Sequence, residues 1–241
     1  MEDGLASVDE WVKMSYNHKK KGEMEMLEKM AAFFEARLDG YDQHMLNNIA
    51  GAKEFYPFTA MQLSQGREAS ILDLGCGTGL ELEYYYLQNP SAKVTGIDLS
   101  AGMLQALKDK FPDKQLKVMQ GSYFDLPFGE VCFDGAVSVE SLHHFTQQEK
   151  IGLYQKLWAA LKLGGYFVLT DYFALSEEEE YTLRQELELL RRKEGICDGE
   201  FYHFDTPLTV NHEIQALQIA GFTQVEILKN WGATYCIKAV K

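Results

Sequence analysis

The sequence predicts an α/β protein built on a doubly wound, mostly parallel sheet with helices on both faces. Two observations predict this fold class. From residue 70 onward, short apolar runs of strand length alternate with longer segments of helical periodicity, as in chains that form parallel sheets. The first apolar run also ends in a glycine-rich stretch, DLGCGTG, which a helical segment follows. A strand, a glycine loop and a helix in this order are typical of ligand-binding α/β domains.

Residues 1–65 are expected to form a separate helical cap segment in front of this sheet. Apolar residues recur at helical spacing up to Leu38, Gly40 interrupts the pattern, and a second helix is predicted from Tyr41 to Ala52. Pro57 and the polar stretch after it are expected to lead into the first strand.

The sheet domain is expected to span residues 66–241. Its first five strands are predicted at 71–75, 92–98, 116–122, 133–140 and 164–173, with helices at 80–88, 101–111 and 148–162. The middle helix begins after Ser100, which is a favourable N-cap residue.

Residues 174–208 interrupt this alternation and are interpreted as a cap insertion. A charged helix is predicted at 176–195, where the acidic run Glu177–Glu180 favours a helix N-terminus. The chain then returns to the sheet domain through a helix at 209–221. Two strands around Gly232 predict a terminal hairpin.

The composition suits one substantial domain that acts on small ligands. The 241 residues are 46% hydrophobic and 24% charged, with a net charge of −13. An acidic chain is a poor partner for nucleic acid, because binding to phosphates depends on Lys and Arg. The tight basic cluster Lys19–Lys21 is interpreted as a solvated helix end. We therefore expect a small neutral or cationic substrate, rather than nucleic acid or an anionic membrane.

The sequence shows no sign of a signal peptide or a membrane helix. The first residues, MEDGLASVDEW, lack a basic segment followed by an apolar one, and no apolar run approaches the roughly 20 residues of a membrane helix. The cysteines are scattered without metal-ligand spacing, so we expect free thiols, no bound metal and a cytoplasmic location. These cysteines are Cys76, Cys132, Cys197 and Cys236.

Three glycines at alternate positions, Gly75, Gly77 and Gly79, predict a loop whose backbone contacts a ligand. A dinucleotide is one candidate. Its G-x-G-x-x-G fingerprint fits poorly, because the third glycine comes one position early and Leu80 stands where the packing glycine belongs. An NAD-dependent oxidoreductase is therefore the less favoured interpretation.

Five stretches together resemble the class I S-adenosylmethionine-dependent methyltransferases, in the family's order and spacing. They are DLGCGTG, the acid of GIDLS, GSYFDLPF, FDGAVSVESLHHF and LKLGGYFVLTD. The resemblance covers residues 68–175 closely and the terminal strand pair more loosely. It implies a seven-stranded sheet whose last strand runs antiparallel, S-adenosylmethionine as cofactor, and methyl transfer to a small-molecule acceptor by direct displacement.

The resemblance also implies a cofactor site. Asp73 corresponds to an acid that orders the methionyl end, and Gly75 and Gly77 to the glycines that lie against it. Asp98 corresponds to the acid that accepts both ribose hydroxyls, a role for which helix capping is the alternative. Ser122 stands where the family usually has an acid that receives the adenine amino group. The full set of expected cofactor residues is Arg37, Tyr41, Asp73, Gly75, Cys76, Gly77, Asp98, Leu99, Met103, Ser122, Tyr123 and Val139.

Arg37 and Tyr41 belong to this set because they match an element that folds over the methionyl carboxylate in small-molecule members. Four residues apart on one helix, a basic and a phenolic donor could reach the same carboxylate. An ordinary exposed Arg and a half-buried Tyr are the alternative.

The candidate catalytic residues are three histidines, His143, His144 and His203. Asp171, at the end of the fifth strand, is a further candidate base. A direct displacement requires alignment above all, and a base only where the acceptor carries a proton of high pKa. The alternatives are a protein that binds S-adenosylmethionine without turnover and a methyltransferase acting on RNA or protein. The residues name neither the acceptor nor the oligomeric state.

Overall fold

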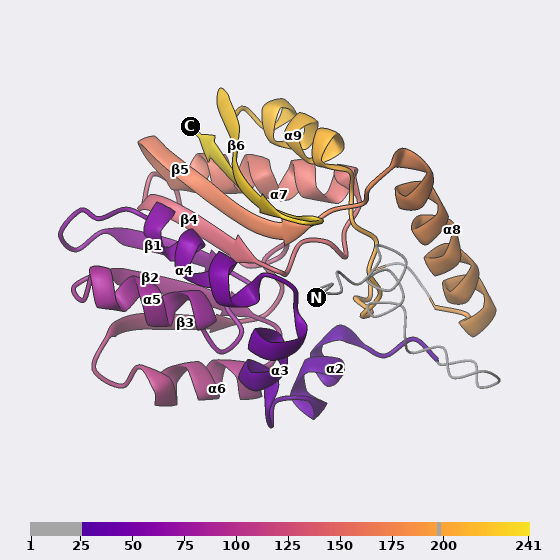
Figure 1. Cartoon of the computed structure of the whole chain (residues 1–241), viewed down its shortest axis with the longest axis horizontal. Helices are drawn as coiled ribbons and strands as arrows, with labels where there is room; N and C mark the ends of the chain where they lie inside the picture. The colour runs from indigo at the N-terminus through magenta and orange to yellow at the C-terminus, as the bar shows by residue number, and fades with distance from the viewer. Residues whose placement is uncertain (1–25, 197–198) are drawn as a thin grey trace, which may run out of the picture.

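The computed structural model describes residues 26–196 and 199–241, and it contains a seven-stranded sheet in the order β3-β2-β1-β4-β5-β7-β6 (Figure 1). The strands β1 to β5 pair in parallel, and β7 runs antiparallel to both β5 and β6. This topology confirms the predicted doubly wound sheet with an antiparallel last strand. The strands are β1 Ser70–Leu74, β2 Lys93–Asp98, β3 Gln115–Gln120, β4 Phe133–Val139, β5 Leu161–Tyr172, β6 Gln224–Trp231 and β7 Thr234–Val240.

Helices cover both faces of the sheet. One face carries α4, α5 and α6, and the other carries α7 and α9. Successive strand residues point to opposite faces. Ile71 of β1 therefore packs in the core under α4, α5 and α6, and Leu72 packs in the core under α7 and α9. The described helices are α2 Met30–Ala36, α3 Tyr41–Asn48, α4 Ala52–Gln62, α5 Leu80–Gln88, α6 Ala101–Lys110, α7 Gln147–Ala160, α8 Glu177–Glu194 and α9 Val210–Ile219.

The N-terminal helices differ from the prediction in two places. The segment expected as one helix from Tyr41 to Ala52 is divided between α3 and α4 by Gly51, whose φ of +77° suits glycine. Pro57 lies inside α4 instead of leading into a strand. A proline inside a helix costs about 3 kcal/mol, and the burial of the α4 side chains Phe55 and Tyr56 offsets that cost.

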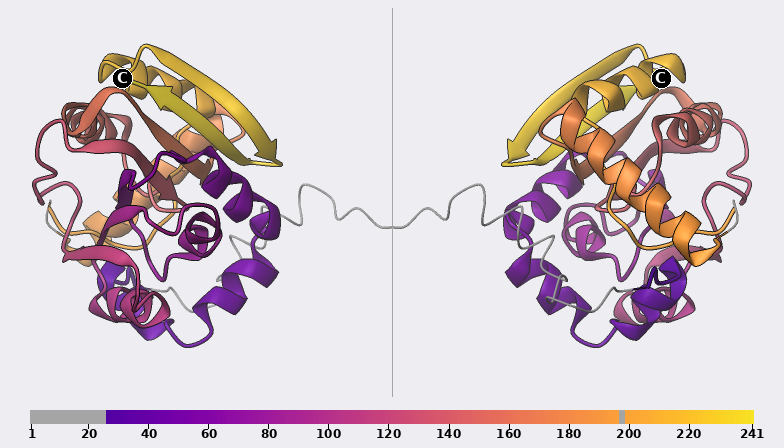
Figure 2. Two further views of the ribbon diagram at one scale, coloured as in Figure 1. Left: turned by 90° about the vertical axis from the view of Figure 1, so that its left-hand side faces the viewer. Right: turned by 90° about the vertical axis from the view of Figure 1, so that its right-hand side faces the viewer.

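The insertion between β5 and α9 is built from α8 and a returning loop. Ser176 caps α8 by accepting a hydrogen bond from the Glu179 amide, which confirms the predicted helix start. In Figure 1 α8 stands apart from the two helical layers, and in the right-hand view of Figure 2 it crosses in front of the sheet.

The returning loop pairs with the N-terminal part of the chain. The Met30 amide donates to the Phe201 carbonyl, and the His203 amide donates to the Glu28 carbonyl. The two segments predicted as caps therefore contact each other. Lys19–Lys21 and Cys197, which the sequence analysis singled out, lie outside the described residues. In the part of the chain that the structure describes, every helix is too short or too polar to cross a membrane.

Candidate cofactor and acceptor site

The candidate site lies where the parallel strands end. The glycine loop follows β1, Asp98 ends β2, the segment 139–144 follows β4, and Asp171 lies at the end of β5. Because β1 to β5 run in parallel, these four ends meet at one edge of the sheet, as in other open α/β sheets.

The three loop positions require or allow glycine for different structural reasons. A Cβ atom on Gly75 would lie 2.0 Å from the Ser141 hydroxyl, and one on Gly79 would lie 2.4 Å from Leu107. At Gly77, where φ is +47°, a Cβ atom would meet no described atom within 4 Å. Gly75 and Gly79 are therefore required by packing within the protein, and Gly77 presents the open face of the loop.

Asp98 is bonded to the glycine loop itself. Its Oδ2 accepts from the Gly77 amide at 2.9 Å, and its Oδ1 accepts from the Ser100 amide at 2.9 Å. Ser100 in turn caps α6 by accepting from the Met103 amide, which leaves the capping role to Ser100 as predicted. Burial raises the pKa of the Asp98 carboxyl, although these amide bonds oppose the shift.

Asp73 forms a buried carboxyl pair with Glu81 from α5. Burial raises the pKa of both groups, and the charge of Glu81 raises that of Asp73 further. Asp73 Oδ2 and Glu81 Oε1 are buried without a hydrogen-bond partner among the described residues. Burial and the adjacent charge thus both favour the protonated form of a carboxyl in this pair.

Three residues of the expected cofactor set turn their side chains into the protein. The Cys76 thiol faces β2, where a Cβ atom on Gly96 would lie 2.7 Å from its sulfur. The Tyr123 hydroxyl donates to the Ser141 carbonyl at 3.1 Å. The Ser122 hydroxyl accepts from the Phe124 amide, so it is engaged in its own turn. Of the remaining residues, Met103 and Val139 are buried and Leu99 is half-buried.

The expectation that Arg37 and Tyr41 lie four residues apart on one helix is wrong. Gly40, with φ +78°, separates the end of α2 from the start of α3, so the two residues do not share a helix. The Arg37 guanidinium lies over the Phe33 ring and pairs with Glu28 at 3.1 Å.

Tyr41 remains beside the site. Burial raises the pKa of the Tyr41 hydroxyl, and the nearby carboxylates of Asp98 and Glu140 raise it further.

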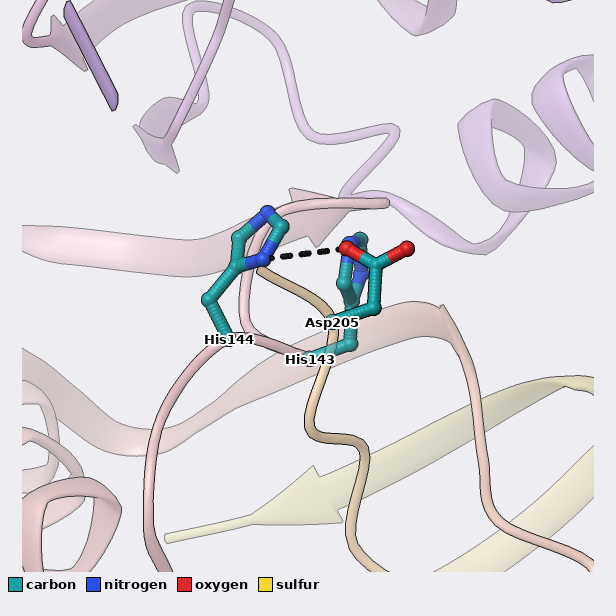
Figure 3. A group of neighbouring side chains, drawn as sticks. All are labelled: His143, His144 and Asp205. Atoms are coloured by element: carbon teal, nitrogen blue, oxygen red, sulfur yellow. Dashed lines mark ion pairs between the residues drawn. The ribbon is translucent and has the colours of Figure 1, made fainter. Parts of the chain in front are cut away.

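A second group of side chains follows β4. His143 Nδ1 lies 2.6 Å from Asp171 Oδ1, and Asp171 Oδ2 accepts from the Leu142 amide at 2.8 Å. The same imidazole presents its Nε2 to Asp205, 3.5 Å away. Figure 3 shows the His144 ring to one side of the Asp205 carboxylate, with the His143 ring behind that carboxylate.

The returning loop brings Asp205 to this position. The Thr206 amide donates to the His143 carbonyl, and its hydroxyl donates to the His144 carbonyl at 3.1 Å. His203, in the same loop, stacks on the Phe33 ring with centroids 3.5 Å apart. The structure thus brings together the three predicted histidines.

The charges of this cluster are unevenly distributed. Burial opposes a charge on His143, yet Asp171 and Asp205 raise its pKa to about 10. Burial and the neighbouring His143 lower the pKa of His144. The pKa of His203 falls to about 3, chiefly through burial. At neutral pH His143 is protonated and the other two rings are neutral.

Asp205 and Glu140 are the parts of the site that sequence reasoning missed. Asp205 is 61 residues from His144 in the chain, in a loop without a recognisable motif. Glu140 gives one retrospective signal, because it directly follows the predicted fourth strand. Its φ is +50°, and burial followed by the charge of Asp171 raises its pKa to about 8.

Residues 72–169 match a family model described as a methyltransferase domain. An uncharacterised methyltransferase of Synechocystis sp. is 34% identical over 126 residues, which cover 52% of this chain and 57% of that protein. An O-methyltransferase of Penicillium expansum is 33% identical over 118 residues, covering 46% of this chain and 41% of that protein. The chain spans between 27% and 57% of the length of the first curated relatives that it matches.

Solved structures match over nearly the whole chain. A putative O-methyltransferase from Nostoc punctiforme has a TM-score of 0.64 at 18% identity, covering 97% of this chain and 68% of that one. Human N-acetylserotonin methyltransferase, solved in complex with S-adenosylmethionine, has a TM-score of 0.63 at 20% identity, covering 96% of this chain and 66% of that one. At these identities the likeness establishes the fold.

Proposed function

Because the chain carries a methyltransferase domain in the class I methyltransferase fold, we propose that it transfers a methyl group from S-adenosylmethionine to a small-molecule acceptor by direct displacement. The acidic composition favours a small acceptor over RNA, as the sequence predicts. Relatives named as O-methyltransferases favour an oxygen atom as the acceptor.

The observation that carries this proposal is the open face of Gly77 beside the Asp98 carboxylate, at the ends of β1 and β2. A ligand can approach the Gly77 backbone, since a Cβ atom there would meet no described atom within 4 Å. Asp98 lies where it can accept hydrogen bonds from a ribose diol, and Tyr41 lies in reach of its charge. S-adenosylmethionine supplies the electrophilic methyl group when it is bound.

The surrounding carboxyl groups suit a ligand with a positive centre. Asp98 and Glu140 raise the pKa of the Tyr41 hydroxyl. Asp73, Asp98 and Glu81 raise the pKa of the Cys76 thiol in the glycine loop. A sulfonium and an ammonium group are favoured in such a field. We retain Tyr41, Asp73, Gly75, Gly77, Asp98, Leu99, Met103 and Val139 as the proposed cofactor residues, with Cys76 contributing only its backbone.

On the acceptor side we assign the described part of the N-terminal segment and residues 174–208 as caps, except that α4 of the N-terminal segment packs on one face of the sheet. The two segments are joined by the hydrogen bond from Met30 to Phe201, and Phe33 of the first segment stacks on His203 of the second. Alignment and exclusion of water are what such caps contribute to a displacement. A reducing, cytoplasmic setting is also proposed, because the described cysteines Cys76, Cys132 and Cys236 are free thiols.

The proposal is tested by binding and turnover on the same preparation. Calorimetry with S-adenosylmethionine and with NAD should show binding of the first and not of the second. Incubation with a panel of hydroxylated small molecules should yield S-adenosylhomocysteine and one methylated product. Binding without product from any small molecule, RNA or protein would favour the non-catalytic alternative. Binding of NAD alone would contradict the assignment.

The first prediction concerns the open face of the glycine loop. Gly77→Val places a β-branched side chain where the cofactor would lie, at a positive φ that valine rarely adopts. We expect calorimetry to show no S-adenosylmethionine binding, with the circular dichroism spectrum retained. Gly164→Val, at a positive φ far from the site in sequence and with no described atom within 4 Å, is the matched control. A folded Gly77→Val protein that binds normally would place the cofactor elsewhere.

The second prediction compares two neighbouring ring-bearing residues of the returning loop, His203 inside the site and Tyr202 at the surface. His203 stacks on Phe33 and contacts His144, whereas the Tyr202 hydroxyl donates to Glu200 at the surface. Once an acceptor is known, His203→Ala should lower kcat at least tenfold and leave S-adenosylmethionine affinity within twofold. Tyr202→Ala should leave both unchanged. Equal turnover of the two variants, with equal melting temperatures, would remove His203 from the acceptor site.

A further inference from the structure

We propose that His143, His144 and Asp205 form a binding site for a divalent transition-metal ion of the zinc type, with His203 in reach as a fourth ligand. One ring nitrogen of each of the first two residues and a carboxylate oxygen of Asp205 lie within 4.8 Å of one another. The site itself rests on this geometry. Only its role toward the acceptor rests on the proposed function.

The spacing of the ligand atoms fits tetrahedral coordination. His144 Nδ1 lies 3.2 Å from Asp205 Oδ1, and His143 Nε2 lies 3.5 Å from the same oxygen. Ligands that bind zinc at about 2.0–2.1 Å in a tetrahedral site are separated from one another by about 3.4 Å. His203 Nε2 lies 4.0 Å from Asp205 Oδ1 but outside the group of three, so it would have to move closer to serve as a fourth ligand.

The carboxylate oxygen at the centre of this group is not satisfied by its neighbours. Asp205 Oδ1 is buried and has no hydrogen-bond partner among the described residues, although three ring nitrogens lie within 4.0 Å. A cation bound between this oxygen and the ring nitrogens would give the buried oxygen a direct partner. His144 Nδ1 also lies 3.2 Å from the Phe204 carbonyl, a contact that coordination through this nitrogen would replace.

Asp171 holds the His143 ring in place, as a carboxylate hydrogen-bonded to a metal-ligating histidine does. Its Oδ1 lies 2.6 Å from His143 Nδ1, so Nε2 is the ring nitrogen that faces Asp205. Metal binding through Nε2 would release the proton that this nitrogen carries in the metal-free imidazolium, while Nδ1 keeps its proton toward Asp171. The Leu142 amide holds the other carboxylate oxygen at 2.8 Å. A carboxylate that fixes the tautomer of a ligating histidine is a regular feature of zinc sites.

The choice of metal follows from the ligand types and the charge. Imidazoles together with one carboxylate suit zinc, cobalt, nickel or iron better than magnesium or calcium. Within residues 26–196 and 199–241, the ion pairs of Asp205 are with the three histidines, and Glu140 and Asp171 add negative charge nearby. A bound ion would hold an oxygen-bearing acceptor at the sheet edge where the methyl group is presented.

Zinc binding to the full-length protein without a histidine tag tests this site. Protein stripped with EDTA and dialysed is titrated with Zn²⁺ against a chromophoric chelator, and Co²⁺ serves as a spectroscopic probe of tetrahedral coordination. We expect one Zn²⁺ per chain. Asp205→Asn and His144→Ala should weaken binding more than about 100-fold, and Asp171→Asn about 10- to 100-fold. His44→Ala, an exposed histidine on α3, is the matched control and should change nothing.

The outcomes separate this inference from the proposed function. Thermal melting in EDTA establishes that each variant is folded. If the parent protein binds Zn²⁺ no more tightly than folded Asp205→Asn and His144→Ala, or if His44→Ala loses as much affinity, the metal site is wrong. S-adenosylmethionine affinity is measured in EDTA on the same stock. Cofactor binding without zinc binding contradicts only the metal site, and zinc binding without cofactor binding contradicts only the proposed function.

Discussion

Replacing Asp98 by alanine is expected to weaken S-adenosylmethionine binding by roughly 30- to 700-fold. The carboxylate ends β2 and accepts the Gly77 amide at 2.9 Å, so it shapes the glycine loop and can also accept the ribose hydroxyls. Loss of two charge-assisted hydrogen bonds corresponds to about 2–4 kcal/mol. Isothermal titration calorimetry measures the affinity directly.

Asp98→Asn provides a graded comparison, because the amide keeps one acceptor oxygen for the loop. We expect its affinity to lie between those of the parent and Asp98→Ala. Asp109→Ala, an exposed aspartate on α6 that pairs with Gln105, is the control and should bind as the parent does. An Asp98→Ala protein whose affinity stays within twofold of the parent would overturn the assignment of this carboxylate.

Lys150→Met is expected to lower the free energy of unfolding by about 3–5 kcal/mol. Lys150 of α7 and Glu213 of α9 form an ion pair at 2.5 Å, with side chains 1% and 0% exposed, and the Tyr154 hydroxyl also donates to Glu213. Removing the ammonium leaves a buried carboxylate without its charged partner. For a chain of this size the loss corresponds to a fall in melting temperature of roughly 6–20 °C.

Two comparisons isolate the burial of the charge as the cause. Lys93→Met makes the same change in the surface pair Lys93–Glu68, where both side chains are about half exposed, and should leave the melting temperature close to that of the parent. The double variant Lys150→Met with Glu213→Leu should recover at least half of the loss, because it removes both buried charges. Differential scanning calorimetry of the parent, the two single variants and the double variant measures these melting temperatures. Equal losses of stability in Lys150→Met and Lys93→Met would contradict this account.

The sequence alone determined the fold class, the order of the elements and several of their ends. Strand and helix periodicities are encoded in windows of a few residues, and so are caps such as Ser100 and Ser176. The same locality placed Asp98 beside the glycine loop, because the ends of adjacent parallel strands meet whatever the other side chains do.

Local patterns were misleading where a distant contact decided the outcome. Pro57 is a strong local signal for a break, but the burial of α4 against its neighbours keeps that helix continuous. Arg37 and Tyr41 fall at helical spacing, but the turn at Gly40 separates α2 from α3, and Arg37 pairs with Glu28. The bare backbone of Gly75 has a further reason that no local pattern shows, because it makes room for the Ser141 side chain.

Only the tertiary structure assembled the histidine and carboxylate cluster. His143 meets Asp171 across 28 residues, and Asp205 reaches His144 across 61 residues by way of α8 and the returning loop. The buried pair Lys150–Glu213 likewise joins residues of two helices, 63 positions apart in the chain. Such meetings depend on strand order and on the path of a loop, which no window of neighbouring residues encodes, whereas the elements themselves follow from propensity and periodicity within a few residues.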